Sequence, residues 1–239
     1  MKGLTGHALF VDLASGEATT RSIPEEWLRD YVGGEGIAVR LFYDLMDPSL
    51  GAFDPAQPII FATGPLTGTA APTSGRFNIV FRSPATGTLG LSNCGGKLAP
   101  QIKRAGWDLI VITGRAEKPV YISILDDEVE IHDATDLWGK GILETEDSIK
   151  DALDVKGLQI ASIGPAGENG VLYASVMNDK HRAAGRGGAG ALMGSKNLKA
   201  IAVQGTHDPP ISDPDALKAR AAAAREELFD EAFVADELA

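Results

Sequence analysis

Two segments of this 239-residue chain hold arginine, lysine and glycine but no acidic residue, and their composition is the one best suited to chemistry. No Asp or Glu occurs in residues 55–107 or 180–207, although the whole chain has 33 acids. An even spread would put about seven acids in the first segment alone. Half of the 28 glycines also lie in these segments. This composition is typical of a main-chain site for an anion, here a phosphate. Buried strands and turns, where acids are scarce, are the plainer alternative.

The second segment contains Gly185-Arg-Gly-Gly-Ala-Gly190, which matches the G-x-G-x-x-G pattern of dinucleotide-binding loops. That fingerprint needs an apolar strand directly before it and an acid about 20 residues after it. Neither is present in this sequence, so a Rossmann site is not expected. The successive N–H groups of the loop, which lead into a short helix from Ala191, still suit a phosphate.

The first segment contains three residues whose side chains could bind a ligand or react. Arg76 follows Thr73-Ser-Gly, which suits two-pronged contact with a phosphate or a ring carbonyl, or simply a surface arginine. Asn93 is expected on a tight loop, where its oxygen could bind Mg²⁺ or cap the turn. Cys94 is expected to be a small buried residue, because no histidine is near it in sequence. We find no metal-ligand spacing of histidines and no catalytic acid–base pair, and we expect Glu168 to cap a turn.

Composition excludes several classes of protein. The chain is 44% apolar, 23% charged and carries a formal net charge of −11, which argues against a nucleic-acid partner. No apolar run approaches the roughly 20 residues that a membrane span needs, and the first residues lack the apolar core of a signal peptide. The single cysteine excludes an intrachain disulfide and an iron–sulfur cluster held by four cysteines of this chain. A soluble cytoplasmic protein is expected.

The elements that must position these segments follow from periodicity and turn residues. Hairpins are predicted over residues 8–22 and 120–131, and helices over residues 24–32, 37–46 and 144–153.

Residues 58–114 and 159–205 share one order of elements: strand, Gly-Pro turn, strand, glycine-rich loop, short helix, strand. Gly64-Pro65 and Gly164-Pro165 are matching landmarks. The pattern predicts an internal duplication, with two equivalent anion sites about a pseudo-twofold axis and a ligand that has two phosphate-bearing halves.

Residues 208–239 differ from the rest of the chain. Asp208-Pro-Pro is expected to be a linker, and Ser212-Asp-Pro-Asp is a strong helix start. An apolar stripe then follows at helical spacing: Leu217, Ala221, Ala224 and Leu228. We therefore expect one domain over residues 1–207, followed by a linker and the first helix of a domain that this chain does not contain.

Several stretches resemble the N-terminal domain of the aldehyde:ferredoxin oxidoreductase family. They begin at Gly64-PLTGTAAPTSGRFNIVFRSPATG, Ser92-NCGGKLAPQIKRAGWDLIVITG, Leu137-WG, Ile163-GPAGEN and Asn178-DKHRAAGRGGAGALMGSKNLKAIAVQG. The resemblance implies an α+β fold of largely antiparallel sheets with an internal pseudo-twofold duplication. This fold would form a base for a tungsten or molybdenum bis-pterin cofactor.

The resemblance also assigns residues by motif. Arg76 would contact a pterin and lie towards the iron–sulfur cluster, and Asn93 and Gly95 would hold one pterin phosphate. The Asn93 side chain and the Ala183 carbonyl would reach a Mg²⁺ that links the phosphates. The other phosphate would be held by Arg182, Ala183, Gly185 and Arg186.

The whole enzyme of this family would oxidise an aldehyde to a carboxylic acid and pass electrons to ferredoxin. The four cysteines that hold its [4Fe–4S] cluster are absent here, so the isolated chain is expected to be inactive and to need its missing C-terminal domains or a companion chain. No nucleic acid and no membrane are expected as partners, and a homo-oligomer is possible. Rival hypotheses are a stand-alone module that binds or delivers metallopterin, and a non-catalytic scaffold.

Overall fold

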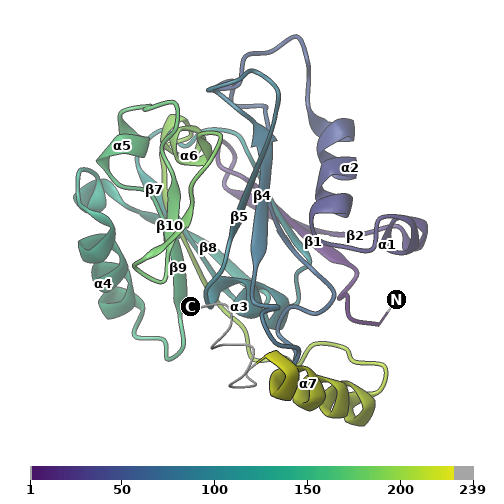
Figure 1. Ribbon diagram of the computed structural model, residues 1–239. Coiled ribbons are helices and arrows are strands. Elements are labelled where there is room, and N and C mark those ends of the chain that lie inside the picture. Colours follow the sequence, from purple (N-terminus) through teal and green to yellow (C-terminus); the bar gives the residue numbers. More distant parts are fainter. Residues whose placement is uncertain (1, 229–239) are drawn as a thin grey trace, which may run out of the picture.

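Two sheets packed face to face, with helices on both outer sides, make up the protein (Figure 1). The computed structural model describes residues 2–228. Each sheet has six strands and is mostly antiparallel, with a single parallel pair, β1–β6 in the first and β7–β12 in the second. The expected α+β class with largely antiparallel sheets is confirmed.

The first sheet has the strand order β2-β1-β6-β3-β4-β5. Its strands are β1 (His7–Asp12), β2 (Glu17–Ser22), β3 (Ile59–Thr63), β4 (Phe77–Arg82), β5 (Leu89–Cys94) and β6 (Leu109–Thr113). Helices α1 (Glu25–Asp30) and α2 (Glu35–Leu45) cover its outer face, and α3 (Leu98–Arg104) precedes β6.

The second sheet has the order β11-β10-β9-β12-β7-β8. Its strands are β7 (Val120–Leu125), β8 (Glu128–Asp133), β9 (Gln159–Ser162), β10 (Val176–Asn178), β11 (Arg182–Ala184) and β12 (Leu198–Gln204). The 3-10 turn η1 (Thr135–Leu137) and helix α4 (Ile142–Leu153) cover its outer face, and α5 (Pro165–Glu168) and α6 (Ala189–Ser195) complete the repeat.

The two sheets have the same connectivity. Reading the second order backwards gives β8-β7-β12-β9-β10-β11, which repeats the first order strand for strand and also in chain order. The predicted duplication is therefore present, but its unit is longer than expected. The hairpin over residues 120–131 was predicted to lie between the repeats, whereas it opens the second repeat and corresponds to the N-terminal hairpin β1–β2.

One apolar core lies between the sheets and belongs to both repeats. Inward-facing residues of both sheets, such as Phe61 and Ile110 of the first and Ile122 and Ile201 of the second, form a single buried cluster. Helices α3 and α6 add Leu98, Ile102, Leu192 and Met193 to it. Separate outer clusters hold α1 and α2 on the first sheet and α4 on the second. Because the central core is shared, neither sheet can bury its inner face alone.

Two strands were missed by the sequence patterns. Strand β5 places Asn93 on a sheet edge and not on the predicted tight loop. Its inward residues are Gly90, Ser92 and Cys94, while Leu89 and Leu91 face outward, so its alternation is the reverse of the usual one. Strand β11 has only three residues, which is too short for periodicity to be recognised.

Helix α7 (Pro214–Leu228) follows the linker, as its start signals predicted. Asp213 caps it by accepting a hydrogen bond from the Ala216 N–H at 2.9 Å. Of the expected apolar stripe, Ala221 is buried and Leu228 is exposed. The remainder of the tail, residues 229–239, lies outside the described residues.

Candidate anion-binding site at the junction of the repeats

The two acid-free segments meet where the edge strands β5 and β11 lie side by side. Four hydrogen bonds join the repeats there, one of them from Asn178 Nδ2 to Cys94 Sγ at 3.0 Å. Ser92 Oγ accepts from the Arg186 N–H at 3.4 Å, and Ser83 Oγ donates to the Gly187 carbonyl at 2.8 Å. The Asn178 Nδ2 group donates to the Gly95 carbonyl at 2.9 Å. Segments about 90 residues apart in sequence thus form one surface.

Strand register shows that matching residues of the two repeats meet at this junction. Ala62 pairs with Asn78, which pairs with Asn93; in the second repeat Ser162 pairs with Met177, which pairs with Ala183. Ala62 and Ser162 are equivalent because each lies two residues before a Gly-Pro landmark, and their β6 and β12 partners, Leu109 and Ala200, are equivalent as well.

It follows that Asn93 is the register equivalent of Ala183, and that Gly95 is the equivalent of Gly185. The motif-based assignment named all four of these residues. The pseudo-twofold relation therefore explains why the same kind of loop, a strand end followed by glycine, occurs twice at the junction.

Both loops present main-chain donors. Among residues 2–228, the N–H groups of Gly95, Gly96, Gly185 and Gly187 have no hydrogen-bond acceptor. Gly96 and Gly187 have positive φ values of 121° and 79°, and Gly188 follows at 90°. Such left-handed glycines turn successive N–H groups towards one side, which makes a concave donor surface for an anion.

Arginines lie close to these donors, since the Arg76 guanidinium is beside Gly95, and Arg182 and Arg186 lie near Gly185 in the chain. Arg76, Arg182 and Arg186 are all exposed at the junction. The Arg76 Nε group donates to Asn93 Oδ1, and the Asn93 amide donates to Asn78 Oδ1 at 2.8 Å. Asn93 is thus held by hydrogen bonds to the side chains on either side of it and does not cap a turn. A surface with three guanidinium groups and no acid in its two segments favours anions.

The hairpin that carries Arg182 is braced by helix α4. Asp179 and Lys180 at its tip both have positive φ, 49° and 60°, a conformation that costs free energy for residues other than glycine. The buried Glu146 carboxylate accepts the Lys180 N–H at 3.0 Å, and Lys180 Nζ pairs with Asp147 at 2.6 Å. These contacts hold the hairpin in its strained shape. Sequence reasoning missed Glu146, since it reads as an ordinary helical acid.

Cys94 is buried, as expected, and its Sγ atom lies 3.0 Å from Asn178 Nδ2. Burial raises the pKa of the Cys94 thiol, while the Asn178 hydrogen bond opposes this rise. A buried thiol with a raised pKa is a poor nucleophile. Asn178 was not recognised as a site residue from sequence; the available signal was a polar residue at an inward position of a strand.

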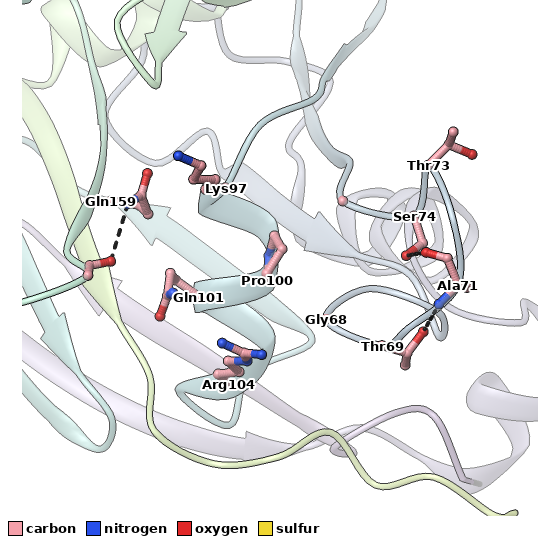
Figure 2. Close-up of a pocket in the computed structure, with 12 residues that line it drawn as sticks. Gly68, Thr69, Ala71, Thr73, Ser74, Lys97, Pro100, Gln101, Arg104 and Gln159 are labelled. Carbon is pink, nitrogen blue, oxygen red and sulfur yellow. Dashed lines mark hydrogen bonds between the residues drawn. The ribbon is translucent and has the colours of Figure 1, made fainter. Parts of the chain in front are cut away.

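A cleft of 590 Å³ adjoins the junction at Gly75 and Lys97. Figure 2 shows it along helix α3, with Thr69, Thr73 and Ser74 on one side and Gln159 of β9 on the other. Its lining contains no acid and has two cations, Lys97 and Arg104. The electropositive surface therefore continues from the β5–β11 junction along α3.

The other candidates from sequence do not join this site. Glu168 forms a buried ion pair with Lys199 and accepts the Gly139 N–H at 2.8 Å, so it fixes a distant loop where a turn cap was expected. Within residues 2–228, no group of three or more His, Cys, Asp or Glu side chains is placed to hold a metal ion. In the same range no helix combines the length and apolarity needed to cross a membrane.

Comparisons with known proteins agree with the motifs. The family model described as "Aldehyde ferredoxin oxidoreductase, N-terminal domain" matches residues 8–205. The chain is 49% identical over 213 residues to a tungsten-containing aldehyde ferredoxin oxidoreductase of Pyrococcus furiosus, and 51% identical to one of Thermococcus kodakarensis. In both comparisons the match covers 89% of this chain and 35% of the relative.

More distant relatives act on other compounds. The chain is 33% identical to an aliphatic sulfonate oxidoreductase, WOR-like subunit, of Pyrococcus furiosus, over 96% of this chain and 39% of that protein. Among solved structures, the active-site complex BamBC of benzoyl coenzyme A reductase with 1,5-dienoyl-CoA matches with a TM-score of 0.87 and 40% identity. That match covers 90% of this chain and 33% of the other. The chain thus spans about a third of the length of the relatives it matches.

Proposed function

Since this chain belongs to the aldehyde ferredoxin oxidoreductase family and corresponds to its N-terminal domain, we propose that it holds a tungsten (or molybdenum) bis-pterin cofactor by its two phosphates at the β5–β11 junction. The observation that carries the proposal is the register equivalence of Asn93 with Ala183 and of Gly95 with Gly185. A cofactor with two similar halves is matched by two similar loops.

The residues of the junction fit such a cofactor. Asn93 and Gly95 hold one phosphate, and the second is held by Arg182, Ala183, Gly185 and Arg186. The donor groups without acceptors and the three guanidinium groups supply the hydrogen bonds and positive charge that phosphates need. Arg76 contacts a pterin ring. When bound, the metallopterin supplies the redox chemistry, whereas these residues bind and orient it.

A Mg²⁺ ion between the phosphates completes the proposed site, with the Asn93 Oδ1 atom and the Ala183 carbonyl as ligands. Oxygen ligands from amides and phosphates suit this cation. In the structure Asn93 Oδ1 accepts from Arg76. An amide oxygen has two lone pairs, so Asn93 Oδ1 could be a ligand of Mg²⁺, and the nearby Arg76 guanidinium would then be available to the cofactor.

The names of the relatives support a division of labour within the longer enzyme. Proteins that share this domain act on aldehydes, an aliphatic sulfonate, glyceraldehyde-3-phosphate or a coenzyme A thioester. A domain common to such different substrates provides the cofactor site and leaves substrate choice to other segments. We propose aldehyde oxidation with ferredoxin as electron acceptor for the whole enzyme, since the relatives with about 50% identity carry that name.

The rest of the proposed enzyme lies beyond this chain. A [4Fe–4S] cluster needs more thiolates than the single Cys94 can supply, so the cluster belongs to further C-terminal domains or a companion chain. Residues 1–207 form the cofactor-binding domain, and α7 begins the next one. The enzyme is cytoplasmic in this proposal. The chain alone does not oxidise aldehydes. A homo-oligomer of the chain is compatible with the proposal.

Native mass spectrometry of the chain, purified without oxygen from its own source, tests this proposal. A complex that contains the chain, bis-pterin, metal and a cysteine-bearing polypeptide supports a working oxidoreductase. Tight binding of the cofactor by this chain alone, with no further polypeptide, favours the stand-alone metallopterin module. The scaffold hypothesis predicts that no cofactor is bound and that the variants Arg76→Ala and Arg182→Ala bind the partner as the wild type does.

A further inference from the structure

Asn178 is buried at the junction but does not belong to either anion loop. Its side chain is 1% exposed and lies on β10, in the second repeat. From there its Nδ2 group reaches the first repeat, where it donates to the Gly95 carbonyl at 2.9 Å and to Cys94 Sγ at 3.0 Å. The residue therefore connects the loop after β5 to the hairpin that carries Arg182.

Asn178 breaks the internal symmetry of the protein. Phe61 and Ala161 are equivalent, because they directly precede the matched residues Ala62 and Ser162. Phe61 pairs with Ile79 and Ala161 pairs with Asn178, so Ile79 is the register equivalent of Asn178. Ile79 is an ordinary core residue. The Asn178 Oδ1 atom has no hydrogen-bond partner within the described chain. A buried acceptor without a partner costs free energy that an apolar side chain of similar size would avoid. Core packing alone does not account for an asparagine at this position.

The geometry of the peptide group shows what the side chain does. No peptide bond in residues 2–228 is cis, so the Gly95 carbonyl and the Gly96 N–H point in opposite directions. Asn178 holds that carbonyl towards the core, which directs the Gly96 N–H outward to the anion surface. On the other side, Asn178 Oδ1 packs against Gly96, where an added Cβ would approach it to 2.6 Å.

We propose that Asn178 is a positioning residue for the anion site: its amide fixes the Gly95–Gly96 peptide so that the Gly96 N–H faces a phosphate, and it keeps the two loops in register. This inference rests on the proposed function of the junction as a phosphate site. It adds a residue that touches no ligand and acts through the peptide that it holds.

The test uses the complete 239-residue chain and the variant Asn178→Leu, which keeps the volume and removes the amide. Inorganic phosphate with Mg²⁺ is the probe. We expect Asn178→Leu to melt within a few degrees of the wild type, because Ile79 shows that an apolar residue fits the equivalent position. Its phosphate affinity should fall about tenfold, as expected for loss of one charge-assisted hydrogen bond.

A second readout needs no ligand. Cys94 is the only cysteine and is buried beside Asn178, so its rate of reaction with a thiol reagent reports on the order of the loop. Asn178→Leu should react several-fold faster, and the Gly96 amide should exchange hydrogen faster. Ser123→Ala is the matched control, since Ser123 is equally buried and hydrogen-bonded but lies on β7, outside the site.

The outcomes separate this inference from the proposed function. Wild-type rates and wild-type phosphate affinity in Asn178→Leu would overturn the role of Asn178, while a loss of affinity in Arg182→Ala would still support the phosphate site. Absence of phosphate binding by the wild type would overturn the phosphate site, and the Cys94 and Gly96 rates would still decide whether Asn178 orders the loop. Should Asn178→Leu fail to fold, Asn178→Val serves for the same measurements.

Discussion

At the scale of single residues, the arginines of the second loop should dominate phosphate binding. Arg182→Ala removes an exposed guanidinium from the junction, where no acid of either segment compensates. We expect phosphate affinity to fall at least tenfold, because a charge-assisted hydrogen bond contributes about 1.5–3 kcal/mol. Isothermal titration with inorganic phosphate measures the change. Arg29→Ala, an exposed arginine paired with Asp30 far from the site, is the control and should bind like the wild type.

Lys196 gives a prediction about pH. Its Nζ atom is buried and donates to the carbonyls of Pro55 and Gly114 at 2.7 and 3.1 Å. Burial lowers the pKa of Lys196 to about 8, although Asp54 and Asp12 oppose the shift. The unfolded chain, with a pKa near 10.5, therefore binds more protons between these values, and the folded state gains stability as pH rises.

Relative to Lys196→Met, the free energy of unfolding of the wild type should increase by about 2 kcal/mol from about pH 7 to about pH 10. Urea denaturation at the two pH values measures this difference. The neutral amine still has two N–H groups for the two carbonyls, so no hydrogen bond is lost on deprotonation. A difference that stays constant with pH would show that Lys196 titrates normally.

At the scale of elements, α5 and α6 pack so closely that the second anion loop has little freedom. A Cβ added at Gly194 would lie 2.0 Å from the Gly167 carbonyl oxygen, and one at Gly190 would lie 2.4 Å from the Ser175 oxygen. Main-chain atoms cannot move aside cheaply. The loop at residues 185–188 is thus fixed at one end by α6 and at the other by β11.

Gly194→Ala should therefore destabilise the fold by about 3 kcal/mol, which is typical of overpacking against rigid neighbours. Urea denaturation gives the value. Gly51→Ala introduces the same methyl group where no atom lies within 4 Å, and its effect should stay within about 0.5 kcal/mol. Equal stability of the two variants would mean that α5 and α6 can separate without cost.

The elements also show what the sequence could and could not predict. The hairpins, helices α1, α2 and α4 and the start of α7 followed from apolar periodicity and from the turn and helix-start residues beside them. Strand β5 was missed because its small inward residues make room for Phe81, whose ring lies 2.5 Å from a Cβ added at Gly90. The charge pattern predicted both halves of the candidate site. Asn178 and Glu146 could not be found this way, since their roles depend on contacts far apart in sequence.

At the scale of the whole molecule, residues 1–207 should fold without the tail. Helix α7 buries Ala221 and donates from Arg225 to the Ala70 carbonyl, and Pro210 accepts the Gly3 N–H at 2.6 Å. These contacts are few compared with the shared core between the sheets. A chain that ends at residue 207 should melt cooperatively within a few degrees of the full chain.

Calorimetry of both chains decides this prediction, and phosphate titration of the shorter chain adds a functional check. Unchanged affinity would support residues 1–207 as the complete binding unit. Loss of cooperative melting would mean that α7 belongs to the same domain as the sheets.

The strand order has a consequence for solubility. Each sheet ends on one side at the junction, where β5 and β11 shield each other, and on the other side at β2 or β8. Those two outer strands carry Glu17 and Arg21, and Glu128, Glu130 and Asp133. Charged edge strands resist the addition of a further strand from a neighbouring molecule. Among residues 2–228 the outer edge strands therefore carry charged side chains, and concentrated solutions should resist fibril formation.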